Sequence, residues 1–168
     1  FVSELEGMFQ VYYDRVSLGR EKVMLEYSTT IKNDDFPTSL RGSFERDRIL
    51  TYTTVGVHRD DLNLSLEGYP VKKLGSQGQK KSFLTALKLA QFAYLVKQKG
   101  VKPLLLLDDI FDKLDADRVS QIIQIVSSTD FGQVFVTDTN REHIDEILQQ
   151  HVMEYKIFHV EGGEVMNL

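Results

Sequence analysis

The feature that most constrains the fold is a run of four leucines, residues 104–107, followed directly by Asp108 and Asp109. An uninterrupted apolar strand is typical of a central parallel strand that is covered on both faces. In open α/β sheets, ligands bind beyond the carboxyl ends of such strands. A carboxylate there can hold Mg²⁺ beside nucleotide phosphates, and a second one can orient and deprotonate an attacking water. A turn or helix cap would explain one aspartate, but two adjacent ones favour a cation.

The elements around this strand alternate between helices and strands. Residues 77–97 are apolar on most sides, which predicts a long helix buried against a sheet, with Ser76 as its N-cap. Residues 117–127 have the spacing of an amphipathic helix, and residues 134–136 predict a second buried strand that ends at Thr137. These elements indicate an α/β fold in which a mostly parallel sheet is covered by helices.

The end of the sequence predicts one more helix and a hairpin. Residues 140–149 have a helical pattern, and residues 155–160 and 164–166 form a hairpin pattern around Gly162 and Gly163.

Residues 1–55 are more polar and more interrupted than residues 56–168, and we divide the chain there. Residues 21–30 predict a half-buried strand, and Thr38 or Ser39 is expected to cap a short helix. In the second region, residues 61–68 predict another strand, with Val71 beginning the return strand of a hairpin. The first residues look like the middle of a helix, so we expect a segment cut from a longer chain.

Composition excludes some classes of protein. The net charge of −5 gives no overall basic character, so any DNA contact needs a local basic patch. The chain contains no cysteine, which excludes disulfides and thiolate metal sites and suits the cytoplasm. Uninterrupted apolar runs such as residues 104–107 are far too short to cross a membrane.

The segment before the long helix is a candidate phosphate contact. A helix N-terminus exposes unpaired N–H groups and the positive end of the helix dipole, Gly78 allows close approach, and Ser76 adds a hydroxyl. A plain serine cap would explain the same residues. The stretch 75–82 also nearly matches a Walker A loop, but Lys80 replaces the second glycine, where a side chain would obstruct the phosphate. No intact Walker A motif occurs in the chain.

Three further groups of residues allow both a structural and a functional interpretation. The charged turn at residues 112–115 follows the acidic pair. Thr137 ends a strand near that pair, where it could sense a γ-phosphate or simply lead into a helix cap. His58 and Arg59 could approach the phosphate of a nucleotide or of DNA, or could form salt bridges with the aspartates that follow them.

Taken in order, these motifs resemble the second half of an ABC ATPase head, and residues 56–62, the Ser-Gln-Gly-Gln sequence and the Asp-Asp pair resemble the RecF family. Val57 stands where that family usually has proline, and no histidine occupies the switch position. The resemblance implies a Walker B aspartate at Asp108 that holds Mg²⁺, a catalytic residue at Asp109 and a switch residue at Thr137. It further implies a D-loop that ends at Asp115, and a signature that contacts ATP in trans through Ser76, Gln77, Gly78 and Gln79.

The resemblance also implies that residues 1–55 are the returning part of a second lobe and residues 56–168 the C-terminal part of the head. The intact protein would bind ATP, form a homodimer and bind DNA at single-strand gaps or double-strand/single-strand junctions. It would help to load recombinase with RecR and RecO in the cytoplasm, while the segment alone would be inactive.

Other interpretations remain open at this point. They are another SMC-like or RecN-like head, a non-catalytic dimerisation domain, and a receiver-like phospho-acceptor module built on Asp108, Asp109, Thr137 and Lys156. The order of the strands argues against the receiver.

Overall fold

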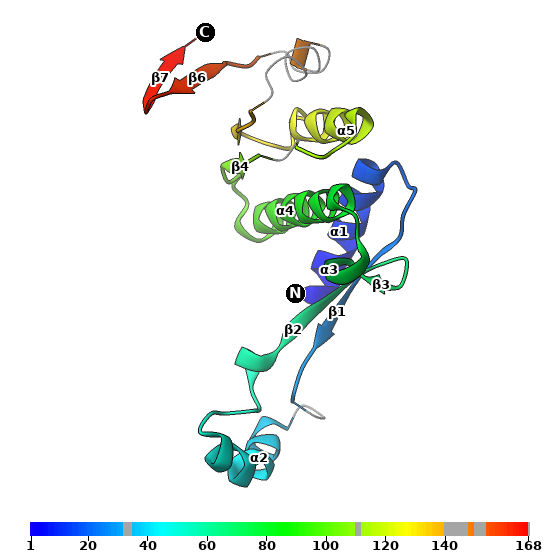
Figure 1. Cartoon of the computed structure of the whole chain (residues 1–168), viewed down its shortest axis with the longest axis vertical. Helices are drawn as coiled ribbons and strands as arrows, with labels where there is room; N and C mark the ends of the chain where they lie inside the picture. Colours follow the sequence, from blue (N-terminus) through cyan, green and yellow to red (C-terminus); the bar gives the residue numbers. More distant parts are fainter. Residues whose placement is uncertain (32–34, 110–111, 140–147, 150–153, 168) are drawn as a thin grey trace.

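The computed structural model describes residues 1–31, 35–109, 112–139, 148–149 and 154–167. The helices and strands lie along an elongated molecule, with α2 at one end and the β6–β7 hairpin at the other (Figure 1). In chain order they are α1 (Val2–Ser17), β1 (Val23–Ser28), α2 (Phe36–Leu50), the 3₁₀ turn η1 (Val57–Arg59), β2 (Asp61–Leu66), β3 (Tyr69–Pro70), α3 (Val71–Leu74), α4 (Gln77–Lys99), β4 (Leu105–Leu107), α5 (Ala116–Val126), β5 (Val134–Val136), β6 (Phe158–Glu161) and β7 (Glu164–Asn167).

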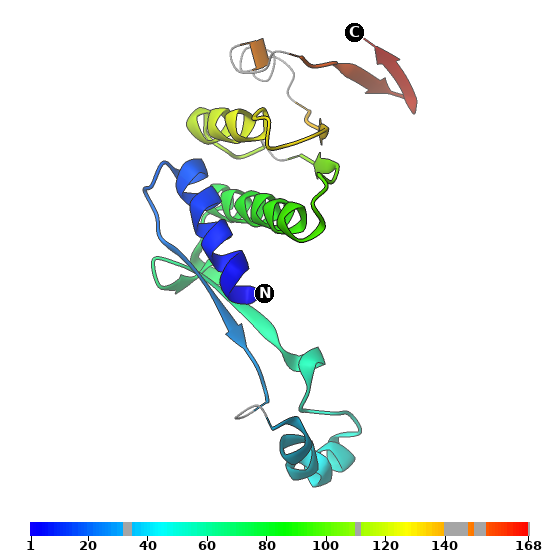
Figure 2. The same ribbon diagram turned by 180° about the vertical axis from the view of Figure 1, so that it is seen from behind.

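Strands β1 and β2 form an antiparallel arm that extends from the helical part of the molecule toward α2 (Figures 1 and 2). Both strands occur where the sequence predicts them, and their register pairs Val23 with Leu66 and Ser28 with Asp61. The prediction that Val71 begins the return strand is wrong, because the return strand β3 is Tyr69–Pro70 and Val71 begins the helix α3. Proline has no N–H to continue the ladder, and its fixed φ suits the start of a helix.

Helix α2 differs from its prediction in its start and its length. Asp35, rather than Thr38 or Ser39, caps the helix, and its carboxylate accepts a hydrogen bond from the Thr38 N–H at 3.3 Å. Proline in the first turn fits this earlier start, because the first N–H groups of a helix have no partner within it. Within α2, all of which is described, Ser43 is the only buried residue, so most of the helix surface is open.

Helix α4 lies between two hydrophobic clusters. On one side, Phe83, Ala86 and Ala90 pack with α1 and the β1–β2 arm; on the other side, Leu89 and Phe92 pack with β4 and α5. The predicted Ser76 cap is confirmed, and Gly100 ends the helix in a left-handed conformation. The expectation of burial on most sides holds only in part, because Leu84 is 54% exposed.

The strands β4 and β5 form the predicted parallel pair, with Leu105 opposite Val134 and Leu107 opposite Val136. Leu105 and Leu107 are buried, whereas Leu106 is 63% exposed and Phe135 is 46% exposed. The predictions of a strand covered on both faces and of a buried second strand are therefore wrong for the described chain. Successive side chains of a strand point to opposite faces, and only the face toward α4 and α5 is covered.

The predicted terminal hairpin is confirmed by the antiparallel pair β6–β7. The helix predicted at residues 140–149 falls mostly outside the described residues. Among the helices of the described residues, none has the length and hydropathy needed to cross a membrane.

Candidate functional site

The carboxyl ends of β4 and β5 bring Asp108, Asp109 and Thr137 together. The Thr137 N–H donates to the Leu107 carbonyl at 2.9 Å, and the Asp109 N–H donates to the Thr137 carbonyl at 3.1 Å and to Thr137 Oγ1 at 3.0 Å. The Thr137 hydroxyl in turn donates to Asp108 Oδ1. Thr137 therefore fixes both aspartates at the sheet edge, where the parallel arrangement predicts them to meet.

Asp108 has the chemistry of a magnesium ligand. Its side chain is exposed, and Thr137 uses only Oδ1, which leaves Oδ2 available for a cation. Mg²⁺ is usually held by one or two carboxylates together with waters and substrate phosphates, so one oriented carboxylate fits this kind of site. Among the described residues, no group of three or more metal-ligating side chains gathers at one place. One carboxylate of this kind leaves most of the six positions around Mg²⁺ to waters or other ligands.

Lys81 joins the N-terminal part of α4 to the acidic edge, a contact that the sequence analysis missed. Its Nζ donates to the Asp109 carbonyl at 2.6 Å and lies 3.4 Å from Asp109 Oδ2 and 3.8 Å from Asp112 Oδ2. Asp109 has a φ of 45°, which is unusual for a residue with a side chain. Lys81 supplies a cation that offsets the two nearby carboxylates.

The N-terminus of α4 is a complete capping box. Ser76 Oγ accepts from the Gln79 N–H at 3.1 Å, and Gln79 Oε1 accepts from the Ser76 N–H at 2.8 Å. Ser76 and Gln77 are exposed, and Gly78 and Gln79 are half-buried. The capping interpretation of Ser76 is thus correct, and the exposed side chains also leave this helix end open to an anion.

The loop of residues 112–115 lies against the first turn of α4. A Cβ added at Gly78 would be only 3.1 Å from the Lys113 carbonyl oxygen, so the glycine permits this close approach. Asp115 caps α5, with its Oδ1 accepting from the Arg118 N–H at 2.9 Å. The segments that resemble a signature and a D-loop are therefore neighbours.

A second cluster that the sequence did not indicate is centred on Glu21. Glu21 Oε1 accepts from Gln79 Nε2 at 2.9 Å and lies 3.1 Å from Arg118 Nη2, while Oε2 accepts from the Tyr13 hydroxyl at 2.5 Å. Burial opposes ionisation of Glu21, but the hydrogen bonds from Tyr13 and Gln79 and the charge of Arg118 outweigh burial and lower its pKa. Burial, followed by the hydrogen bond to Glu21, raises the pKa of Tyr13.

His58 and Arg59 lie at the α2 end of β2 and are not part of this edge (Figure 1). His58 Nε2 lies 3.0 Å from the Thr53 carbonyl, and the Arg59 guanidinium lies 5.0 Å from the centre of the Tyr52 ring. The alternative of salt bridges from His58 and Arg59 to the following aspartates is not found among the ion pairs of the described residues. Asp60 instead accepts hydrogen bonds from the Tyr27 hydroxyl and, at 3.4 Å, from the Thr30 N–H.

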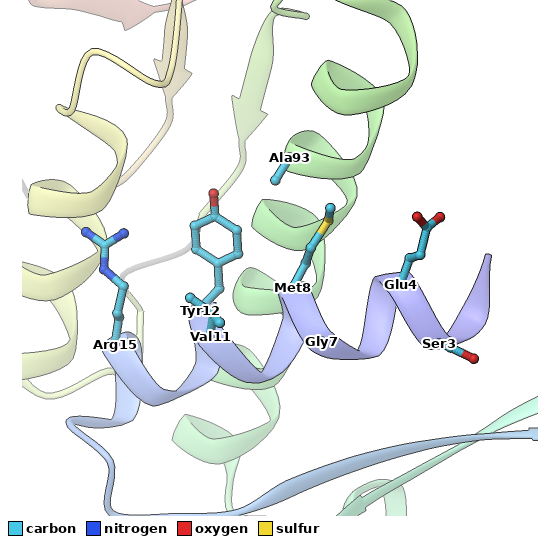
Figure 3. Close-up of a pocket in the computed structure, with 8 residues that line it drawn as sticks. All are labelled: Ser3, Glu4, Gly7, Met8, Val11, Tyr12, Arg15 and Ala93. Carbon is cyan, nitrogen blue, oxygen red and sulfur yellow. The ribbon is translucent and has the colours of Figure 1, made fainter.

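A groove beside α1 is separate from the acidic edge. Seven of its lining residues belong to α1 and one, Ala93, to α4, and Figure 3 shows Met8, Tyr12 and Arg15 along it. Glu4, at its end, is paired with Lys97 at 2.7 Å. None of the residues predicted to contact nucleotide lines this groove, so it is not the site indicated by the sequence motifs.

The fold is that of part of an ABC ATPase head. A Smc head domain from Pyrococcus furiosus matches 99% of the chain with a TM-score of 0.59 at 15% identity. A structure of the recombination mediator protein RecF with ATP matches 99% of the chain and 44% of its own length, with a TM-score of 0.71 at 24% identity. At these identities the likeness shows the fold.

The sequence comparisons point to one protein within that class. RecF from Parabacteroides distasonis is 50% identical over 98% of the chain, and RecF from Bacteroides fragilis is 48% identical over 98%. RecF from Flavobacterium johnsoniae is 46% identical over 95% of the chain. The resemblance to RecF is thereby confirmed. The chain spans about 45% of the length of these relatives, and no family model matches it.

Proposed function

We propose that this chain is the part of a RecF-type ATPase that carries the signature, the Walker B carboxylates and the D-loop. The observation that carries the proposal is the meeting of Asp108, Asp109 and Thr137 at the carboxyl edge of a parallel strand pair. Residues 1–55 would be the returning part of a second lobe, and residues 56–168 the C-terminal part of the head.

The proposed roles within one chain follow from the positions of the oxygen atoms. Asp108 would hold Mg²⁺ through Oδ2, because Thr137 already orients Oδ1. Asp109 would orient and deprotonate the attacking water, and the Thr137 hydroxyl would report the γ-phosphate to both aspartates. Lys81 would keep Asp109 in place through contacts to its carbonyl and carboxylate.

The signature is proposed to act in trans. Ser76, Gln77, Gly78 and Gln79 form the first turn of α4 and its cap, where exposed groups and the helix dipole favour a phosphate. The chain has no intact Walker A motif, so it lacks the loop that would hold the phosphates of its own nucleotide. In the full-length protein, a second copy would present ATP to this helix end, and ATP would close a homodimer.

For the whole protein, we propose ATP-dependent DNA binding in the cytoplasm at single-strand gaps or double-strand/single-strand junctions, with recombinase loading assisted by RecR and RecO. Similarity to RecF supports this proposal. One structural neighbour comes from work on SMC ATPases, which concerns their ATP-driven dimerisation and DNA-stimulated activation. His58 and Arg59 remain candidate phosphate contacts, because both are exposed at the far end of the arm.

The large exposed surface supports the proposal that further polypeptide completes this head. The chain exposes 11592 Å², whereas a compact monomer of its 19.3 kDa mass exposes about 8,500 Å². The chain alone is therefore expected to show no ATP hydrolysis. Hydrolysis by the purified chain at the rate of an intact head would contradict this expectation.

The test of the proposed function is an Asp108→Asn substitution in the full-length protein. Mg²⁺-dependent ATP turnover should fall by about two orders of magnitude or more, because a neutral amide replaces the carboxylate that holds the cation. Asp130→Asn, at an exposed turn, is the matched control and should leave turnover unchanged. Unchanged turnover in the Asp108→Asn variant would support a non-catalytic dimerisation domain instead.

A further inference from the structure

We infer that Glu21 is a positioning residue that holds the signature and the D-loop in one fixed arrangement and connects both to the β1–β2 arm. This inference rests on the proposed function. Glu21 lies between α1 and β1, outside every motif that resembles an ATPase element. Its carboxylate nevertheless contacts Gln79 of the proposed signature directly and reaches the D-loop residue Asp115 through Arg118.

The first connection runs from Glu21 to the signature. Glu21 Oε1 accepts from Gln79 Nε2 at 2.9 Å, and the Oε1 of the same Gln79 accepts from the Ser76 N–H at 2.8 Å. Gln79 is thus held at both ends of its amide. A change in the position of Glu21 would reach Ser76 through a single side chain.

The second connection runs from Glu21 to the D-loop through Arg118. The Arg118 guanidinium lies 3.1 Å from Glu21 Oε1 and donates to Ser82 Oγ at 2.8 Å. Its Nε lies 3.3 Å from Oδ2 of Asp115 in the D-loop. The side chains of Glu21 and Arg118 are only 14% and 12% exposed. A largely buried pair of this kind is costly to break by removing one partner, because the other charge stays buried.

The connection to the arm comes from the position of Glu21 in the chain. Glu21 precedes β1 by two residues, and the adjacent Lys22 N–H donates to the Glu67 carboxylate at the turn that joins β2 to β3. Tyr13 of α1 donates to Glu21 Oε2 at 2.5 Å, which ties the same carboxylate to the core. Displacement of the arm would therefore act on Glu21, and through it on Ser76 and Asp115 together.

A neighbouring pair provides a matched control. Arg20 and Asp117 precede Glu21 and Arg118 by one residue each and join the same two segments at 3.4 Å, but their side chains are 58% and 64% exposed. Exposed pairs contribute little, and these two residues contact neither the signature nor the D-loop in the described ion pairs. Asp117→Asn should therefore leave the nucleotide response unchanged.

The experiment compares Glu21→Gln, Arg118→Lys, Arg118→Gln, Asp117→Asn and Ser76→Asp in the full-length protein. ATP-dependent dimerisation is measured by sedimentation, and ATP binding to the monomer is measured with a fluorescent ATP analogue at low protein concentration. We expect Glu21→Gln to weaken dimerisation at least about tenfold, equivalent to 1.4 kcal/mol, with ATP binding to the monomer unchanged. Arg118→Lys, which keeps the charge, should weaken dimerisation less than Arg118→Gln, which removes it.

The outcomes separate the inference from the proposed function. If Ser76→Asp weakens dimerisation and Glu21→Gln behaves like wild type, the positioning role is refuted and the proposed function stands. A Glu21→Gln variant that loses ATP binding and dimerisation equally would also refute the positioning role, since general destabilisation would explain it. If Ser76→Asp dimerises normally, the trans signature itself is refuted, and the inference with it.

Discussion

Substitutions of Ser76 separate two roles that this residue is proposed to have, the cap of α4 and a contact to a phosphate. The cap consists of Ser76 Oγ and the Gln79 N–H at 3.1 Å. Replacing an N-cap serine by alanine typically costs about 1 kcal/mol of stability, whereas aspartate caps a helix about as well as serine does. Ser76→Ala should therefore lower the free energy of unfolding by about 1 kcal/mol, and Ser76→Asp should leave it nearly unchanged.

For dimerisation we expect the opposite order, with Ser76→Asp more damaging than Ser76→Ala. Aspartate adds a negative charge at the exposed helix end, where the proposed partner presents a phosphate. Two like charges about 4 Å apart repel by about 4 kcal/mol at an effective dielectric constant of 20. Salt reduces this repulsion at an exposed site, so we expect dimerisation at least about tenfold weaker. Ser76→Ala, which adds no charge, should affect dimerisation less than Ser76→Asp.

Urea unfolding of the chain and sedimentation of the full-length protein with ATP measure the two effects. Asp35→Ala is the matched control, because it removes the cap of α2 and its 3.3 Å contact to the Thr38 N–H, far from the signature. It should reduce stability like Ser76→Ala and leave dimerisation unchanged. Normal ATP-dependent dimerisation by the Ser76→Asp variant would refute the reasoning, since a carboxylate would then be tolerated where the phosphate is proposed to lie.

Two further predictions concern stability. Phe83 is 3% exposed and lies in the core between α1 and α4. Phe83→Ala should therefore lower the free energy of unfolding, measured in urea, by about 3–5 kcal/mol. The control Leu84→Ala, at an exposed position, should change it by less than about 1 kcal/mol. The partners of Glu21 hold its folded-state pKa below its usual range despite burial, so their stabilisation is present at neutral pH and is lost as the pH falls through that pKa. Glu21→Gln should therefore show a weaker loss of stability than wild type on acidification, and an equal loss in both would contradict the pairing.

Elements with a strong local pattern could be predicted from the sequence alone. The alternation at residues 23–27 and 62–66 specifies β1 and β2, and Ser76 with Gln79 three residues later is the signature of a capping box. The meeting of Asp108 with Thr137 also follows from sequence, because parallel strands bring their carboxyl ends to one edge. Each of these inferences uses only spacing within a segment or the order of segments.

The missed features depend on contacts between distant segments. Lys81 reaches Asp109 across 28 positions, and Glu21 reaches Arg118 across 97, so no local spacing marks either pair. The start of α2 is misplaced in the sequence prediction because several polar residues there could serve as its cap, and Asp35 is the one that does. Burial of Leu106 was wrongly predicted because an apolar strand indicates that a covering layer is needed, not which segment supplies it.

The two open surfaces of the head require different partners, and their chemistry distinguishes them. The outer face of β4 and β5 presents Leu106 and Phe135, so only an apolar layer can cover it favourably. The helix end at Ser76 and Gln77 presents polar groups and the positive end of a dipole, so its favourable partner is an anion. Further polypeptide from the same protein can complete the first surface without touching the second. If the signature acts in trans as proposed, a complete head would still need nucleotide presented by another copy, and ATP would then control dimerisation.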